Sequence, residues 1–444
     1  MIHVTWSPFG SSRGVNHATC SRSSFSLRRR TFAGASPLLR GAVTRIIDAR
    51  YVHTDETLAV AVVVLALSVY VAAMATFHVV LIRRRREPKA RPSADRPLVS
   101  ILKPLAGADD DLFGNLDSFA ALEGWPYEVV FGVASRSDAA YAAACAFLAR
   151  HPDVAGRVVV TDPHAAINPK IAQLIGLAKK ARGAVLVVSD SNVRVPPHYL
   201  DDLVGRLEDP ACGLVTSVFV GTGERTIGGA LENLQLASTA TPVVVLSTCG
   251  ARPVTVGKSM AMRRVDLERL GGFAAFGGFL AEDHVMGRRF ADAGLRVATS
   301  FVPVENRNVD ATVARTFERH SRWAKLRRAL APTLFTLEPF LVPIIVATVA
   351  TLLVPSRVTV AALGIAIVVQ TFGAHVAVRA ARGSWLPFRY APLEIVRSVV
   401  VVGCWFAAWW SMTVTWRGNR LVIGPDSSLE RWRSTRPSSD RPTA

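Results

Sequence analysis

Residues 184–192 read AVLVVSDSN, and this stretch decides how the chain around it is interpreted. The segment from Ala184 to Ser189 carries no charge, which is typical of a strand buried on both faces of a parallel sheet. The run stops at Asp190. A polar residue directly after such a strand lies at the carboxyl edge of the sheet, where α/β proteins bind their ligands. For an isolated aspartate, the alternative is a simple turn residue.

Strand and helix patterns alternate around this segment, which predicts an α/β domain with a mostly parallel sheet. Strands are expected at residues 99–102, 128–133 and 157–160, and helices at 138–149, 170–182 and 285–293.

Two polar segments, residues 135–138 and 190–192, follow predicted strands and therefore point to one crevice at the carboxyl edge of this sheet. Asp190 and Asn192 offer hard oxygen ligands for a divalent cation, which in proteins is usually shared with substrate phosphates. Asn168 caps a helix that opens with Pro169 and Lys170, and this arrangement offers a cation and backbone N–H groups to an anion. An ordinary helix start is the alternative. Asp190 and Asn192 are thus a candidate metal and diphosphate site, and the helix start at Asn168 is a candidate anion site.

An acidic pair lies in the sequence LAEDH, residues 280–284, just before a helical pattern. Carboxylates at a helix N-terminus are stabilised in their ionised form by the helix dipole. An ionised Asp283 could take a proton from a hydroxyl nucleophile as a general base, with Glu282 in supporting or acceptor contacts. An acid at a helix N-cap is the alternative.

A basic amphipathic helix is predicted around RHSRW, residues 319–323. Its cations, Arg319 and Arg322, could contact a phosphate, and Trp323 could stack on a sugar or pack against the domain. A juxtamembrane basic helix is the alternative.

Apolar runs indicate a membrane protein. Residues 57–82 carry no charge and would span about 39 Å as a helix. Four arginines follow directly, so the positive-inside rule places the next part of the chain in the cytoplasm. Three more apolar runs, at 340–354, 358–378 and 398–416, lie near the other end. The first of them is short enough to be re-entrant.

The net charge of +18 does not indicate a nucleic-acid binder. Residues 1–50 hold eight Arg and one acid, and most other basic clusters flank apolar runs, where they meet anionic lipid headgroups. The five cysteines show no paired spacing, so neither a zinc site nor a disulfide framework is indicated.

These patterns divide the chain into five parts. Residues 1–56 form a basic extension expected to be disordered, 57–82 a transmembrane helix, 97–330 a cytoplasmic catalytic domain, 331–416 about three membrane helices, and 417–444 a basic tail.

The motifs and their order resemble membrane-bound glycosyltransferases of families 2 and 21, of the ceramide glucosyltransferase type. Among these the chain is most similar to the bacterial hopanoid-biosynthesis-associated glycosyltransferases. The resemblance rests on VSILKPL (99–105), NPKI (168–171), DSNVRV (190–195), GKSM (257–260), AED (281–283), RxxRW (319–323) and TWRG (415–418).

The resemblance implies a GT-A fold, the Rossmann-like nucleotide-diphospho-sugar transferase domain, with flanking transmembrane helices in the bacterial inner membrane. It also implies a UDP-sugar donor, Mg²⁺ or Mn²⁺ on Asp190, and a membrane lipid as acceptor. Asp283 would be the catalytic base, assisted by Glu282. The donor would be bound by Asp138, Lys170, Asp190, Asn192, Arg319, Arg322 and Trp323.

Two departures from the family pattern bear on the substrates. The first acidic cluster reads ASRSD at 134–138, so only Asp138 remains of several acids. Residues 238–242 lack the histidine of the animal ceramide enzymes. A hopanoid polyol with UDP-N-acetylglucosamine is therefore expected ahead of ceramide with UDP-glucose. The alternatives are a processive polysaccharide synthase, for which four apolar runs are few, and a non-catalytic membrane scaffold.

Overall fold

The computed structural model describes residues 37–87, 96–108, 110–250, 253–416 and 419–431. The expectation of a disordered extension therefore lies outside the described residues for positions 1–36. Residues 417–418 and 432–444 of the basic tail also lie outside the described residues.

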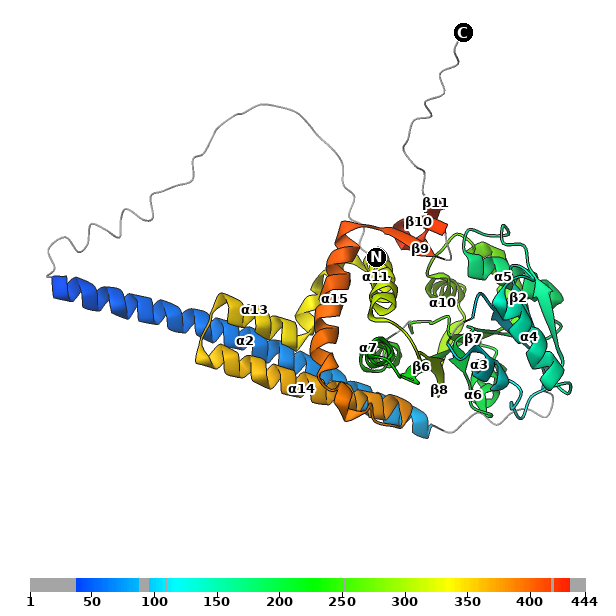
Figure 1. Cartoon of the computed structure of the whole chain (residues 1–444), viewed down its shortest axis with the longest axis horizontal. Helices are drawn as coiled ribbons and strands as arrows, with labels where there is room; N and C mark the ends of the chain where they lie inside the picture. Colours follow the sequence, from blue (N-terminus) through cyan, green and yellow to red (C-terminus); the bar gives the residue numbers. More distant parts are fainter. Residues whose placement is uncertain (1–36, 88–95, 109, 251–252, 417–418, 432–444) are drawn as a thin grey trace, which may run out of the picture. The chain divides into compact units, whose positions relative to one another are not determined.

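An eight-stranded mixed sheet in the order β3-β2-β1-β4-β7-β6-β8-β5 forms the centre of the α/β domain (Figure 1). The neighbours from β3 to β4 are parallel, whereas β7 is antiparallel to both of its neighbours and β5 is antiparallel to β8. The strands are β1 Val99–Pro104, β2 Tyr127–Val133, β3 Gly156–Val160, β4 Val185–Ser189, β5 Val193–Arg194, β6 Cys212–Thr222, β7 Ser259–Arg263 and β8 Arg296–Arg307.

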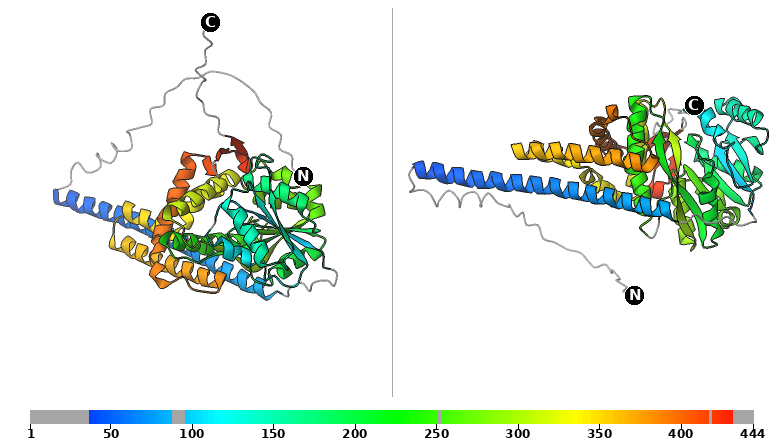
Figure 2. Two further views of the ribbon diagram at one scale, coloured as in Figure 1. Left: turned by 45° about the vertical axis from the view of Figure 1, so that its right-hand side comes forward. Right: turned by 90° about the horizontal axis from the view of Figure 1, so that it is seen from below.

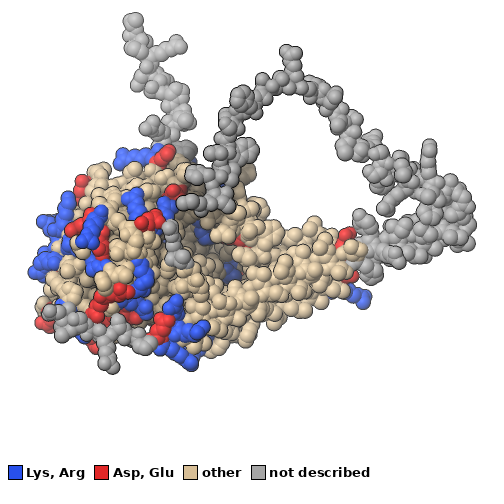
Figure 3. Space-filling view, turned by 180° about the vertical axis from the view of Figure 1, so that it is seen from behind, with Lys and Arg blue, Asp and Glu red and all other residues tan. Residues whose placement is uncertain are grey.

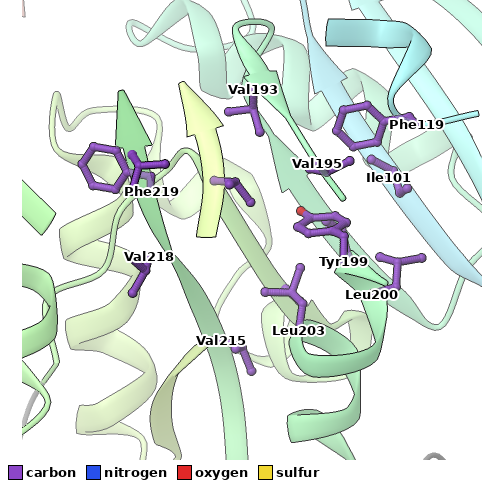
Figure 4. Close-up of a cluster of buried hydrophobic side chains, with 14 of the residues drawn as sticks. Ile101, Phe119, Val193, Val195, Tyr199, Leu200, Leu203, Val215, Val218 and Phe219 are labelled. Carbon is purple, nitrogen blue, oxygen red and sulfur yellow. The ribbon is translucent and has the colours of Figure 1, made fainter. Parts of the chain in front are cut away.

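Successive side chains of the central strands point to opposite faces of the sheet and build two apolar cores. Ile101 and Val187 belong to one core, and their neighbours Leu102 and Val188 belong to the other. Tyr199 lies in the first core with Ile101 (Figure 4). A charge at any of these four strand positions would therefore be buried.

Helices cover both faces of the sheet (Figures 1 and 2). Phe147 of α4 and Tyr199 of α6 pack into the first core, and Ile171 of α5 and Phe290 of α10 pack into the second. The helices of this domain are α3 Leu112–Asp117, α4 Ala139–Arg150, α5 Pro169–Lys180, α6 Tyr199–Gly205, η1 Arg206–Glu208, α7 Ile227–Gln235, the π-helix η2 Leu236–Ala240, α8 Thr241–Ser247, α9 Arg264–Arg269, η3 Phe273–Phe276, α10 Glu282–Asp292 and α11 Val313–Leu330.

The predicted strands up to β4, and helices α4 and α5, lie within two residues of their observed bounds. The expectation of a mostly parallel sheet is confirmed, because among the described strands of this sheet only β7 and β5 run against the others. Strands β5 to β8 were not predicted. The two residues of β5 are too few for a pattern, and β6 mixes polar with apolar residues although nearly all of it is buried.

The described residues include three helices that are long and apolar enough to cross a membrane. They are Thr54–Arg86 within α2 Pro37–Arg86, α14 Arg357–Arg382 and α15 Leu393–Trp410. A fourth candidate combines α12 Pro332–Leu337 and η4 Glu338–Leu341 with α13 Pro343–Leu353, across a 70° bend. On the face shown in Figure 3, charged side chains gather over the α/β domain and are sparse over the helical part.

The expected extent of the disordered extension needs correction. Helix α2 begins at Pro37, so residues 37–56 are helical and not a disordered extension. Proline suits the first turn of a helix, and the following residues contain no further proline before Arg86. In the segment expected as a basic tail, β10 Asn419–Ile423 pairs with β9 Thr413–Trp416 and with β11 Leu429–Arg431, and η6 Pro425–Ser427 lies between β10 and β11.

Buried polar contacts connect the membrane helices to each other and to the α/β domain. Gln370 of α14 donates to Glu394 of α15 at 2.6 Å, and Arg397 of α15 donates to Gln235 of α7 at 2.6 Å. From residue 59 onward, α2 lies beside α14 (Figures 1 and 2), and Arg85 donates to the backbone oxygen of Ala380 at 2.7 Å. Apolar residues of α2 and α14, such as Leu81 and Val378, also belong to the first core of the α/β domain.

Candidate active site

The ends of several elements converge beyond the carboxyl end of β4. Asp190 directly follows β4, Lys258 directly precedes β7, and Lys170 is the second residue of α5. Glu282 and Asp283 open α10. Because β4 and β7 are antiparallel neighbours, the end of the first strand meets the beginning of the second.

Asp190 lies between two lysine ammonium groups. Its Oδ1 is 2.9 Å from Nζ of Lys170, and its Oδ2 is 3.2 Å from Nζ of Lys258. Burial alone would raise the pKa of the Asp190 carboxyl, but the two ammonium groups outweigh burial and hold the pKa well below its usual range. Asp190 is therefore ionised at neutral pH.

Lys170 joins three elements through one buried ammonium group. Besides Asp190, its Nζ contacts Oε1 of Glu282 at 3.1 Å and donates to the backbone oxygen of Gly257 at 3.1 Å. Burial would lower the pKa of Lys170, but Asp190, Glu282 and Asp283 together raise it above its ordinary value. The ammonium group therefore remains charged.

Asp283 is held by backbone N–H groups. Its Oδ2 accepts from the N–H of Gly257 at 2.6 Å, and its Oδ1 accepts from its neighbour's N–H at 2.8 Å. Gly257 thus contacts both Asp283 and Lys170. A Cβ on this glycine would lie 2.7 Å from Nζ of Lys170 and 3.1 Å from Oδ2 of Asp283, which explains why a glycine occupies this position.

Glu282 is more deeply buried than Asp283 and is held from two sides. Its Oε1 contacts Lys170, and its Oε2 accepts from Nδ2 of Asn168 at 3.1 Å. Burial raises the pKa of Glu282 against the opposing charge of Lys170, and the negative charge of Asp283 adds to the rise. These contacts suit a supporting residue, whereas the half-buried Asp283 is the better placed proton acceptor.

The expected anion site on the backbone of α5 needs correction. The N–H groups of Lys170 and Ile171 both donate to Oδ1 of Asn168, so the cap already satisfies them. The cationic group at this helix start is the Lys170 side chain, whose ammonium group contacts Asp190, Glu282 and Gly257.

Two lysines at this site were not predicted as site residues. Nζ of Lys258 bonds Oδ1 of Asn192 at 2.9 Å as well as Asp190. Lys103 is fully buried at the end of β1, where its Nζ donates to the backbone oxygen of Asp190 at 2.9 Å. The available signal was a lysine in each of two otherwise uncharged motifs, VSILKPL and GKSM.

Asp138 lies at the carboxyl end of β2, at the edge of the sheet where it was predicted. Its Oδ1 accepts from the N–H of Ala140 at 2.9 Å, which caps α4, and from the N–H of Gly107 at 2.8 Å. These contacts tie the loop after β1 to α4.

The RHSRW helix, α11, reaches the site with Arg319. This arginine donates to Glu232 at 2.9 Å and to Asn308 at 3.0 Å. Burial lowers the pKa of Lys258, and the negative charge of Asp190 partly offsets this by raising it. The positive charge of Arg319 lowers the pKa of Lys258 further. Arg319 therefore lies close enough to act electrostatically on the site.

The other two predicted residues of α11 have different environments. Arg322 is half-buried. Trp323 packs against the first apolar core and lies edge-to-face with His320, with ring centroids 5.4 Å apart. Of the two roles open to Trp323, these contacts favour packing the helix over stacking on a sugar.

The arrangement does not fit a divalent cation held by the protein alone. Both carboxylate oxygens of Asp190 contact ammonium groups, and Oδ1 of Asn192 accepts from one of them. The described part of the chain contains no group of three or more His, Cys, Asp or Glu side chains that could hold a metal ion. A divalent cation on Asp190 would lie beside these ammonium groups, and like unit charges 4 Å apart near a protein surface repel by about 4 kcal/mol. The described structure therefore shows no site for a divalent cation at Asp190 in the absence of the donor diphosphate, with which the sequence predicts the cation to be shared.

A family model described as "Glycosyl transferase family 21" matches residues 60–429. The chain belongs to this family. Its mixed α/β, GT-A-like fold agrees with the fold expected from the sequence.

Two curated proteins of Caenorhabditis elegans are similar to part of the chain. Ceramide glucosyltransferase 3 is 26% identical over 275 residues, which cover 61% of this chain and 60% of that protein. Ceramide glucosyltransferase 1 is 26% identical over 256 residues, 57% of this chain and 55% of that protein. The chain thus matches less than two thirds of the length of these relatives.

Solved glycosyltransferase structures show limited similarity. The mannosyltransferase PcManGT from Pyrobaculum calidifontis, in complex with GDP-Man and Mn²⁺, aligns with 79% of this chain and 99% of its own length, at 20% identity and a TM-score of 0.47. S. aureus TarS 1-349 in complex with UDP-GlcNAc aligns with 74% of this chain and 97% of its own length, at 13% identity and a TM-score of 0.34.

The lysine contacts of Asp190 predict that the nucleotide-free protein binds Mn²⁺ weakly. Calorimetric titration of the purified protein with MnCl₂ should give no tighter binding than titration of the Asp190→Asn variant, because the ammonium groups oppose a dication. Tight Mn²⁺ binding that Asp190→Asn abolishes would contradict this expectation and show that Asp190 holds the cation without a donor phosphate.

Proposed function

We propose that the chain is a membrane-bound, inverting glycosyltransferase that moves a hexose from a UDP-sugar to a hydroxyl group of a membrane lipid. The observation that carries the proposal is the convergence of Lys170 and Lys258 with Asp283 at one edge of the sheet. One edge thus offers cations for a diphosphate and a carboxylate for a hydroxyl proton.

The two lysines are the proposed diphosphate site. When the donor binds, its phosphate oxygens would take over ammonium hydrogen bonds that Asp190 and Asn192 accept in the free protein. Charge-assisted bonds of this kind are among the stronger hydrogen bonds in proteins. Positive charge at this place would stabilise the negative charge that develops on UDP as it leaves.

Asp283 is the proposed general base. It would accept the proton of the acceptor hydroxyl while the hydroxyl oxygen attacks the anomeric carbon on the face opposite UDP. The new carbon–oxygen bond forms as the bond to the diphosphate breaks, and the product is a glycoside of inverted configuration. The N–H of Gly257 fixes the orientation of the carboxylate, as positioned proton transfer requires.

The proposed acceptor is a lipid because the catalytic domain packs directly on candidate membrane helices. Gln235 of α7, in the domain, bonds Arg397 of α15, and α11 carries basic residues typical of an interfacial helix. The positive-inside rule favours the cytoplasmic side. A hopanoid polyol is the acceptor favoured by the motifs, and ceramide is the second candidate, favoured by the names of the two curated relatives.

Asp283→Asn tests the catalytic base. The amide oxygen can still accept from Gly257, but it cannot take a proton, so transfer should fall by about 10²–10⁴-fold while UDP affinity stays near that of the wild type. Transfer would be measured in purified membranes with a radiolabelled donor, and UDP binding by calorimetry. Glu282→Gln is the matched comparison and should lose less. Transfer by Asp283→Asn within about threefold of wild type would remove Asp283 from this role.

Parallel assays identify the acceptor. Purified enzyme is offered bacteriohopanetetrol and ceramide, each with UDP-N-acetylglucosamine and with UDP-glucose. We expect product from the hopanoid with UDP-N-acetylglucosamine, because its polyol tail carries a reachable primary hydroxyl at the membrane surface.

The other outcomes of these assays have distinct meanings. Turnover of ceramide alone would replace the hopanoid with the second candidate. Polymer formed without any added lipid would indicate a processive polysaccharide synthase. Normal UDP binding by a protein that transfers sugar to none of the acceptors would point to a non-catalytic role.

A further inference from the structure

A small sheet made from the C-terminal end of the chain packs against the segment that precedes the catalytic acids. This sheet, β9 to β11, follows α15 after two residues. The N–H of Leu280 donates to the backbone oxygen of Ser427 at 2.9 Å, and the N–H of Leu429 donates to the oxygen of Gly278 at 2.7 Å. The two contacts bracket residues 278–280, directly ahead of α10.

A side-chain contact adds to these backbone bonds. The N–H of Ala281 donates to the hydroxyl of Ser427 at 3.3 Å, and Ser427 is fully buried. Ala281 occupies the N-cap position of α10 but has no side chain that could cap the helix. The first turn of α10, which carries Glu282 and Asp283, is therefore positioned by Ser427 of the C-terminal sheet.

The backbone at this contact is unusual. Asp426 and Ser427 have φ angles of 52° and 63°, in the left-handed region that non-glycine residues seldom adopt. Such conformations persist where the surroundings fix them, and they cluster at functional sites. The carboxylate of Asp426 also contacts the guanidinium group of Arg288 in α10 at 3.0 Å. The turn at residues 426 and 427 therefore contacts α10 itself as well as residues 280 and 281 before it.

Apolar packing secures the sheet in the same place. Leu280 shares a small core with Leu421, Ile423 and Leu429 of the C-terminal sheet, separate from the two cores of the main domain. The ammonium group of Lys325, on α11, donates to the backbone oxygen of Thr413 at 2.7 Å. The sheet thus joins the end of the last membrane helix to α11 and to the segment before the catalytic acids.

We propose that Ser427 is a positioning residue for the catalytic base. By holding residues 280 and 281, it sets the first turn of α10 so that Asp283 accepts from the N–H of Gly257. The inference rests on the proposed role of Asp283 as the base.

Ser427→Ala removes the hydroxyl and tests the inference, with Ser428→Ala as the matched control. The hydroxyl of Ser428 makes no hydrogen bond to residues 278–281 in the described structure. Loss of one buried hydrogen bond predicts that kcat falls about threefold to tenfold, with the KM for the UDP-sugar nearly unchanged.

A second variant separates positioning from folding. Ser427→Gly also lacks the hydroxyl but accommodates the positive φ without strain, so it should unfold at the wild-type temperature or above and still be slow. Equal kcat values for Ser427→Ala, Ser427→Gly and Ser428→Ala, with Asp283→Asn inactive, would overturn the inference alone. Unimpaired transfer by Asp283→Asn would instead overturn the proposed base.

Discussion

The buried ammonium group of Lys170 is the interaction on which the rest of the site depends. It contacts carboxylates that follow β4 and open α10, and it donates to the backbone ahead of β7. A buried cation is tolerated only when its charge is compensated and its hydrogen bonds are made. Removing this ammonium group would leave Asp190 with one lysine and Glu282 without a countercharge. Gly257 would keep its bond to Asp283 but lose the one to Lys170, so the three elements would lose their common contact.

Asp190 and Glu282 both contact this ammonium group, but their carboxyl pKa values shift in opposite directions. Asp190, between two lysines, is held ionised with a depressed pKa, whereas burial raises the pKa of Glu282. Pairs of acids whose environments push their pKa values apart often mark a division of labour. Asp283 contacts backbone N–H groups at both oxygens and is the acid best placed to exchange a proton. On this account Asp190 orders the lysines, Glu282 supports Lys170, and Asp283 performs the chemistry.

Local sequence patterns were enough to predict the positions of Asp190 and Asn168. The position of Lys258 depends on contacts between residues far apart in the sequence. The strand that ends at Asp190 was predictable because six uncharged residues stop at a carboxylate, and Asn168 was predictable as a helix cap. Lys258 was not, because it meets Asp190 only through the antiparallel pairing of β4 with β7, about 70 residues apart. The C-terminal sheet was missed because its strands are short and the basic composition of the tail masks the apolar residues Leu421, Ile423 and Leu429.

The most direct test of the account is the affinity of UDP for Lys258→Met, measured by calorimetry on purified protein. If Lys258 and Lys170 bind the diphosphate, loss of one charge-assisted contact should weaken UDP binding by about tenfold to a hundredfold. Lys180→Met, at the far end of α5, is the matched control, because Lys180 is exposed, and it should bind UDP as the wild type does. Unchanged UDP affinity in a correctly folded Lys258→Met protein would contradict the account and place the donor elsewhere.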